Sequence, residues 1–140
     1  MEWNNSKKDA KPEWKTFNAK VLVAEDNPAN RILIETILKK HGIQATVTED
    51  GRQALNAAQA EPFDLILMDM QMPVMNGFEA TQALRQKGYT TPIVALTASV
   101  MVGDREKCLE CGCDDFIAKP IDRKRLQEVL ESILSGTAEP

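Results

Sequence analysis

The sequence predicts an α/β fold in which five parallel strands form one doubly wound sheet with five helices on its two faces. Short, almost wholly apolar segments alternate along the chain with stretches whose apolar residues recur at helical spacing. Only short loops join these segments, which favours a parallel sheet with right-handed crossovers. The length of 140 residues is enough for one domain with a proper core.

The first two strand–helix pairs are expected between residues 21 and 60. Val21–Ala24 is nearly continuous in apolar residues, as expected of a strand buried on both faces. Residues 33–38 carry apolar side chains at helical spacing, and Gly42 marks the end of that helix. Ala45–Thr48 is a weaker strand, expected at an edge of the sheet, and Gly51–Ala60 is expected to be helical.

Three further strand–helix pairs complete the predicted unit. A turn-rich loop, residues 71–77, follows the third strand. The last helix, residues 126–134, has the clearest amphipathic stripe in the chain. The strands are Phe63–Met68, Pro92–Leu96 and Asp115–Ala118, and the other helices are Phe78–Lys87 and Val100–Cys111.

Two polar segments flank the predicted domain, which spans residues 19–134. Residues 1–18 contain lysines and a proline but no sustained apolar period, so they are predicted to be a linker or disordered tail. From this segment Trp14 or Phe17 is a candidate to pack against the domain. Residues 135–140 are predicted to be a short disordered tail.

The composition narrows the possible functions. A net charge of −4 does not indicate the strongly basic surface with which proteins bind nucleic acid. No apolar run approaches the roughly 20 residues that a membrane span needs, and the N-terminus lacks the apolar core of a signal peptide. We therefore expect a cytoplasmic domain that itself contacts neither nucleic acid nor a membrane.

The three cysteines, Cys108, Cys111 and Cys113, are expected to be reduced thiols. Their odd number, without a secretion signal, argues for a reducing compartment. Their clustering resembles a metal knuckle, but a structural zinc site needs four ligands and the only histidine, His41, is far away in sequence. We interpret the cysteines as partly buried thiols.

Polar side chains stand at the C-terminal ends of four predicted strands. Glu25 and Asp26 follow the first strand, Asp69 the third, Thr97 the fourth and Lys119 the fifth. Because these ends share one edge of a parallel sheet, where ligands bind, the five side chains are expected to meet.

Three carboxylates in one cleft require compensation, because two charges 4 Å apart repel by about 4 kcal/mol at an effective dielectric constant of 20. Lys119 and a divalent cation would supply it. Mg²⁺ prefers oxygen ligands, and its remaining positions can hold phosphoryl oxygens. A carboxylate can attack phosphorus to form an aspartyl phosphate, while Lys119 and Thr97 contact phosphoryl oxygens. The strand ends therefore predict a Mg²⁺-dependent phosphoryl site.

Each of these groups has a structural alternative when taken alone. Asp26 and Asn27 before Pro28 suit a helix N-terminus with proline in its first turn. Thr97 could cap a helix, and Lys119 could belong to an ordinary loop. Their combination, each at a strand end and in this order, favours the phosphoryl site.

These segments resemble the receiver domain of two-component response regulators. The resemblance covers about residues 20–134 and implies the flavodoxin-like strand order 2-1-3-4-5. The matching segments are Val21-Leu22-Val23-Ala24-Glu25-Asp26-Asn27, Leu67-Met68-Asp69-Met70-Gln71-Met72-Pro73-Val74-Met75-Asn76-Gly77, Ala95-Leu96-Thr97-Ala98 and Phe116-Ile117-Ala118-Lys119-Pro120.

The resemblance implies a role for each residue of the site. Asp69 corresponds to the phosphoacceptor. Glu25 and Asp26 correspond to the acid pair that holds Mg²⁺, together with Asp69 and the backbone carbonyl of Gln71. Lys119 corresponds to the lysine that contacts the phosphoryl group.

The resemblance also implies switch and tuning residues around the phosphoacceptor. Thr97 corresponds to the hydroxyl that moves onto the phosphoryl group, and Phe116 to the aromatic rotamer switch, where many receivers have tyrosine. Gln71 and Ser99 occupy positions that tune how long the phosphoryl group survives. The Lys119–Pro120 peptide bond is expected to be cis.

The expected function is a phosphorelay step in which Asp69 takes a phosphoryl group from a phosphohistidine and the domain changes conformation. The partner would be a histidine kinase or a histidine phosphotransfer protein. The isolated domain would not be an enzyme, although it would catalyse its own phosphorylation and dephosphorylation. The methionine-rich run Met68–Gly77 and the segment Asp26–Asn30 both resemble receivers of hybrid histidine kinases more than those of transcription factors. This resemblance would make the chain a cytoplasmic part of a kinase that could be membrane-bound.

Four alternatives stay open at this point. The chain could be a stand-alone response regulator, or a pseudo-receiver that binds partners without phosphorylation. A haloacid-dehalogenase-like phosphatase would need a second acid at the position of Gln71. A nucleotide-binding module would need a glycine-rich phosphate loop after the first strand. The last two helices could also form a homodimer.

Overall fold

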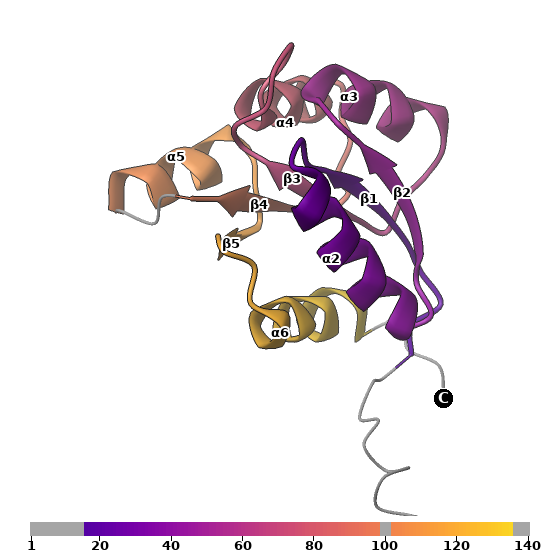
Figure 1. Ribbon diagram of the computed structural model, residues 1–140. Coiled ribbons are helices and arrows are strands. Elements are labelled where there is room, and N and C mark those ends of the chain that lie inside the picture. The colour runs from indigo at the N-terminus through magenta and orange to yellow at the C-terminus, as the bar shows by residue number, and fades with distance from the viewer. Residues whose placement is uncertain (1–15, 99–101, 136–140) are drawn as a thin grey trace, which may run out of the picture.

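Figure 1 shows the computed structural model, which describes residues 16–98 and 102–135. Strands and helices alternate along the whole described chain. The strands are β1 (Lys20–Ala24), β2 (Gln44–Thr48), β3 (Leu65–Asp69), β4 (Ile93–Thr97) and β5 (Asp115–Ala118). The helices are α2 (Pro28–Lys40), α3 (Gly51–Ala60), α4 (Gly77–Gln86), α5 (Val102–Cys111) and α6 (Arg123–Leu134).

The five strands form one parallel sheet in the order β2-β1-β3-β4-β5. The predicted fold class and strand order are therefore confirmed. The register pairs Asp69 with Leu96 and Thr97 with Ala118, so the C-terminal ends of β3, β4 and β5 lie along one edge.

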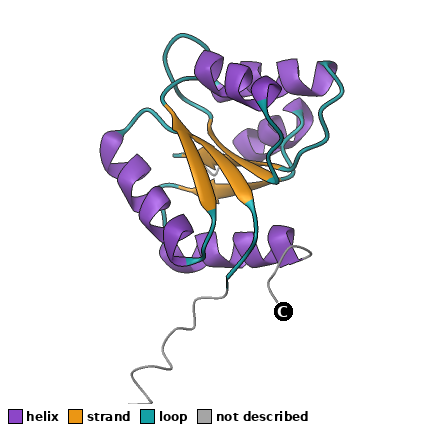
Figure 2. Cartoon of the chain, turned by 90° about the vertical axis from the view of Figure 1, so that its right-hand side faces the viewer, coloured by secondary structure: helices purple, strands orange, loops and turns teal. Residues whose placement is uncertain are grey.

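Helices cover both faces of the sheet, and the alternation of side chains along each strand divides the core into two layers (Figure 2). Val21, Val23 and Leu67 face α2 and α6, whose buried residues include Leu38 and Leu130. The intervening residues of the same strands face α3, α4 and α5; they include Leu22, Ala24, Ile66 and Met68. Burial on both faces explains why the central strands are almost wholly apolar.

Local sequence signals set where the helices begin. Asn27 caps α2, because its side chain accepts hydrogen bonds from the backbone N–H groups of Ala29 (2.9 Å) and Asn30 (3.1 Å), and Pro28 occupies the first turn. Asn76 and Glu79 form a capping box at the start of α4. This box starts α4 at Gly77, one residue before the predicted start.

The N-terminal edge of the packed unit includes Phe17, which is 2% exposed and belongs to the core layer under α2. Its backbone N–H donates to the carbonyl of His41 (2.8 Å), and its ring lies 5.6 Å from the His41 ring. The packed unit thus begins before the predicted start at residue 19. Trp14 lies outside the described residues.

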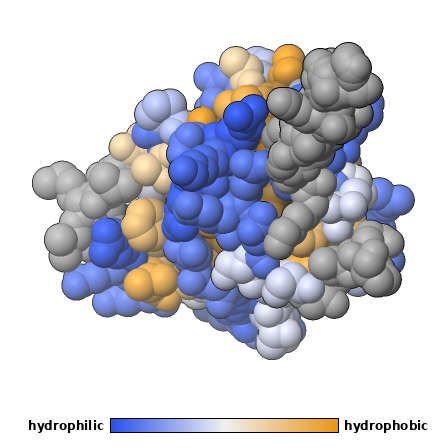
Figure 3. All heavy atoms as spheres, turned by 90° about the horizontal axis from the view of Figure 1, so that it is seen from below, coloured by the Kyte–Doolittle hydropathy of each residue, from blue (hydrophilic) through white to orange (hydrophobic). Residues whose placement is uncertain are grey.

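The described part of the surface, seen from below, is mainly hydrophilic, with apolar residues in small separate groups (Figure 3). Among the described helices, none has the length and apolar character needed to cross a membrane.

Candidate functional site

The predicted site residues converge at the C-terminal edge of the sheet. Glu25 and Asp26 follow β1, Asp69 ends β3, Thr97 ends β4, and Lys119 follows β5. Glu25 is fully buried, Asp69 is 1% exposed and Thr97 is 8% exposed, whereas Asp26 is open to solvent. The site is therefore a buried acidic floor with one carboxylate at its solvent side.

Lys119 bridges the two buried carboxylates. Its Nζ donates a hydrogen bond to Oδ2 of Asp69 at 2.8 Å and lies 3.1 Å from Oε1 and 3.3 Å from Oε2 of Glu25. One ammonium thus offsets two carboxylates, so the three groups together retain one negative charge. A buried excess of negative charge of this kind favours the binding of a cation.

Burial and charge set the proton affinities of this pair. Burial raises the pKa of Asp69 above 3.8, and the charge of Glu25 adds to the increase, although hydrogen bonds from Lys119 and the Gln71 backbone oppose it. Burial on its own would lower the pKa of Lys119, but its hydrogen bond to Asp69 and the charges of Asp69 and Glu25 raise it instead. Lys119 therefore stays protonated beside the phosphoacceptor candidate.

The carboxylates also fit a divalent cation. One oxygen from each of Glu25, Asp26 and Asp69 lies within 4.8 Å of the other two. Oε1 of Glu25 is buried and makes no hydrogen bond, although the Lys119 ammonium is near, so a lone pair in the acidic floor is left for another partner. Hard oxygen ligands of this kind suit Mg²⁺.

The loop after β3 is held tightly against the site. The backbone N–H of Gln71 donates to Oδ1 of Asp69 at 3.0 Å, while the Gln71 side chain is exposed. A Cβ on Gly77 would lie 2.2 Å from the carbonyl oxygen of Asp69, and a Cβ on Gly51 would lie 2.1 Å from that of Met75. Only glycine permits these approaches, which fix where the loop leaves the strand.

The switch candidates lie on β4 and β5. The Lys119 backbone N–H donates to the Thr97 carbonyl at 2.8 Å, which ties the strand end of Thr97 to the lysine. Phe116 is half-buried in the layer under α5. The Lys119–Pro120 peptide bond is cis. Ser99 lies outside the described residues.

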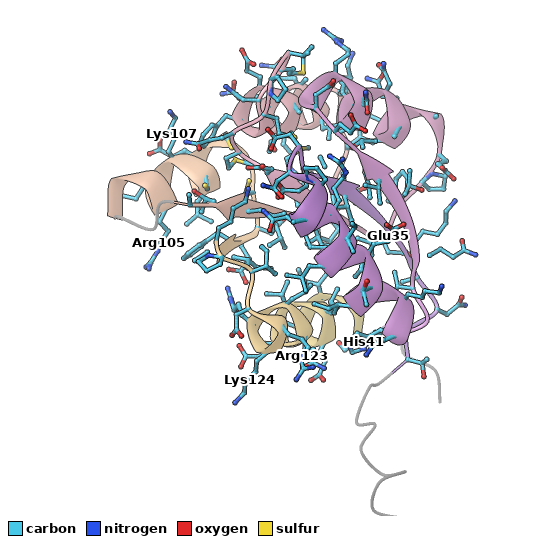
Figure 4. The ribbon with its side chains drawn as sticks, in the orientation of Figure 1. Glu35, His41, Arg105, Lys107, Arg123 and Lys124 are labelled. Atoms are coloured by element: carbon cyan, nitrogen blue, oxygen red, sulfur yellow. The ribbon has the colours of Figure 1, made fainter. Side chains whose placement is uncertain are left out.

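Several contacts around the site were not evident from the sequence. Arg31 of α2 donates to the backbone carbonyl of Glu25 at 2.9 Å, and the Asn27 N–H donates to Oε2 of Glu25 at 3.1 Å. The Arg105 guanidinium lies 5.0 Å from the centre of the Phe116 ring, and Lys107 lies 4.5 Å from that of Phe78 on α4 (Figure 4). A cation in this position stabilises an aromatic ring by about 0.5–1 kcal/mol at exposed sites. The sequence pattern alone does not mark Arg31 and Arg105 as partners of Glu25 and Phe116, because these contacts depend on how each helix packs beside the neighbouring strand end.

Comparisons with known proteins agree with this geometry. Residues 21–131 match the response regulator receiver domain family. Hybrid signal transduction histidine kinase I of Dictyostelium discoideum is 48% identical over 122 residues, which cover 81% of this chain and 7% of that protein. Other sensor and hybrid histidine kinases are among the curated relatives. The chain spans only 4–14% of the length of these much longer proteins.

Two solved structures are similar in fold and sequence. The receiver domain of sensor histidine kinase PA1611 from Pseudomonas aeruginosa, which has a magnesium ion coordinated in its active site cleft, is 41% identical with a TM-score of 0.78. That match covers 84% of this chain and 98% of that one. The second structure is the complex of the receiver domain of Ssk1 with the histidine phosphotransfer protein Ypd1 from Saccharomyces cerevisiae. The match has 31% identity and a TM-score of 0.81, and it covers 89% of this chain and 94% of the matched chain. With its parallel sheet, its acidic strand ends and these matches, the chain belongs to the response regulator receiver domain family.

Proposed function

We propose that this receiver domain takes a phosphoryl group from a phosphohistidine onto the carboxylate of Asp69. The observation that carries the proposal is the contact of Lys119 with Asp69 (2.8 Å) inside a buried acidic cluster. In the transfer, the bond from phosphorus to the imidazole nitrogen breaks and a bond from phosphorus to an Asp69 oxygen forms. The imidazole leaves as the neutral histidine once it has taken a proton.

Mg²⁺ fits the site as its cofactor. Glu25, Asp26, Asp69 and the backbone carbonyl of Gln71 would hold the ion, which when bound neutralises charge on the transferring group. Lys119 stays protonated and orients Asp69 for attack, then pairs with a phosphoryl oxygen. Gln71 and Ser99 are proposed to set the lifetime of the aspartyl phosphate.

Phosphorylation is proposed to shift the domain between two conformations. The added negative charge would draw the Thr97 hydroxyl and Lys119 toward the phosphoryl group, and Phe116 would move into the space that Thr97 leaves. Phe116 lies under α5 and carries the Arg105 guanidinium over its ring, so its movement would reach the surface of α5 and β5.

The proposed donors are a histidine kinase or a histidine phosphotransfer protein. Two likenesses support this: the receiver of Ssk1 forms a complex with the phosphotransfer protein Ypd1, and the curated relatives are hybrid or sensor histidine kinases. We propose that residues 19–134, with Phe17 packed against them, form the receiver of a hybrid kinase and act in the cytoplasm, and that the residues before Phe17 belong to the linker.

Intact mass spectrometry after incubation with acetyl phosphate tests the proposal. We expect a single phosphoryl adduct that requires Mg²⁺ and is lost in Asp69→Asn. Asp122→Asn, which removes a carboxylate at the start of α6, is the matched control and should retain the adduct. If the folded protein forms no adduct in any condition, the domain is a pseudo-receiver. If Asp69→Asn is still modified, another residue is the acceptor.

A further inference from the structure

A pair of thiols lies away from the phosphoryl site, at the turn between α5 and β5. Cys111 ends α5 and Cys113 precedes β5, and their side chains pack in the core layer that α3, α4 and α5 cover. Both are reduced and buried, at 8% and 6% exposure. Their sulfur atoms are 3.9 Å apart and in hydrogen-bonding contact.

Arg85 of α4 holds this turn in place. Its Nε donates to the carbonyl of Gly112 at 2.9 Å, and its Nη2 donates to Oδ2 of Asp114 at 3.0 Å. Gly112 has a φ of +117°, and a Cβ there would lie 2.6 Å from Cγ of Arg85. The turn therefore needs glycine between the cysteines, and this conformation is what brings both sulfur atoms to the same side.

The two thiols differ in acidity. The hydrogen bond with Cys113 lowers the pKa of Cys111 to about 7, and the nearby Arg85 charge contributes, although burial opposes both. The same hydrogen bond, together with burial, raises the pKa of Cys113. A cysteine of lowered pKa with a second cysteine beside it is typical of thiols that are oxidised to a sulfenic acid and then form a disulfide with the neighbour.

We propose that Cys111 and Cys113 form a redox site, in which hydrogen peroxide converts the two thiols to an intrachain disulfide. The Cys111 thiolate attacks a peroxide oxygen, the O–O bond breaks, and Cys111 becomes a sulfenic acid as hydroxide leaves. The Cys113 sulfur then attacks the Cys111 sulfur, the S–S bond forms, and the sulfenic oxygen leaves as water. The two thiols lose two hydrogens in total, and the peroxide is reduced to two waters.

Closing the bond requires the sulfur atoms to approach from 3.9 Å to about 2.05 Å. Because one cysteine ends α5 and the other leads into β5, this movement draws the end of the helix toward the strand that carries Phe116. The redox site is thus connected to the face that the phosphorylation switch is proposed to use, but its chemistry does not depend on Asp69.

Peroxide titration of the full chain tests the site. After brief treatment, unfolding in the presence of an alkylating reagent and intact mass spectrometry should show a species that has lost two hydrogens and carries one alkyl group, on Cys108. Dithiothreitol should restore three alkyl groups. Peptide mapping should place the link between Cys111 and Cys113. Cys108→Ser should keep the link, and Cys111→Ser and Cys113→Ser should each lose it.

Three results would overturn the proposal: a link that includes Cys108, a link between two chains, or oxidation of Cys111 to sulfinic acid without disulfide. Circular dichroism of each serine variant checks that the variant is folded before its oxidation is compared. Asp69→Asn serves as a second background, since it should form the same disulfide at the same rate whether or not the phosphorylation proposal holds.

Discussion

At the scale of single residues, burial of the reactive carboxylate of Asp69 is expected to lower the stability of the domain. Its carboxylate is 1% exposed, and burial raises its pKa despite the hydrogen bond from Lys119. The ionised carboxylate is destabilised in the folded domain, and binding of a cation or formation of the bond to a phosphoryl group offsets this destabilisation. The residue that is proposed to accept the phosphoryl group should therefore weaken the unliganded domain.

Asp69→Asn should consequently stabilise the domain at pH 7 in the absence of divalent cations. Since the folded pKa of Asp69 is raised above 3.8, its favourable contribution belongs to the protonated form and is lost as the pH rises through that folded pKa. The gain from asparagine should therefore shrink toward zero as the pH falls to 3.8. Urea unfolding across this range measures it, with exposed Glu35→Gln as a control that changes stability by less than about 0.5 kcal/mol. An asparagine variant that is less stable at pH 7 would contradict the expectation.

Thr97 should separate phosphorylation from the switch. Thr97→Ala leaves Asp69 and Lys119 in place, so acetyl phosphate should still modify it. Without the hydroxyl, most of the phosphorylation-dependent change in hydrogen exchange of α5 and β5 should disappear. Thr81→Ala is the matched control, because it removes the same kind of hydroxyl from a buried position on α4, and it should respond as the original chain does. An undiminished response in Thr97→Ala would exclude Thr97 as the switch.

At the scale of elements, the sequence predicted the order and type of all ten helices and strands of the described chain, because each carries a local signal. Continuous apolar runs mark the strands, and caps such as Asn27 mark helix starts. Positions that depend on distant partners were not predictable. Phe17 stood in a segment predicted to be a linker or tail, where it was one of two candidates to pack against the domain; the sequence could not show that its partners are His41 and the α2 core, which lie beside it in space.

Gly77 illustrates a constraint between elements and provides a test of it. Gly77→Ala would place a methyl group 2.2 Å from the Asp69 carbonyl oxygen and 2.8 Å from Cα of Met70, so the end of β3 must shift. We expect a loss of roughly 1–3 kcal/mol in the free energy of unfolding, as for other overpacked sites. We also expect slower phosphorylation by acetyl phosphate.

Gly88→Ala is the comparison for Gly77→Ala. Gly88 has a φ of +88°, and a Cβ there would meet nothing within 4 Å. Alanine should cost about 1–2 kcal/mol through backbone strain alone. The rate of phosphorylation should not change. Equal effects of the two variants on that rate would show that the approach of Gly77 to β3 does not position Asp69.

At the scale of the whole molecule, the site exists only because four strand ends meet. The sequence could predict which side chains meet, since parallel topology places strand ends on one edge. It could not predict that Lys119 contacts Asp69 and Glu25 at once, or that Oε1 of Glu25 lacks a hydrogen bond. These facts depend on rotamers and burial that many elements determine together.

Because the carboxylates come from β1 and β3, a cation that binds them should stabilise the whole domain. A ligand that binds only the folded state adds about 2.7 kcal/mol to the free energy of unfolding at a concentration of 100 times its Kd. Mg²⁺ should therefore raise the urea midpoint of the original chain at pH 7. The increase should be much smaller for Asp26→Asn, which removes one of the three clustered oxygens, whereas Glu35→Gln has the same net charge and should respond fully. The stabilisation by Mg²⁺ should also decrease as the pH falls and Asp69 takes up a proton. Because the pKa of Asp69 is raised, this decrease should begin at a higher pH than for an ordinary aspartate. Equal stabilisation of Asp26→Asn and Glu35→Gln would mean that Mg²⁺ acts through general screening of the acidic surface rather than through these carboxylates.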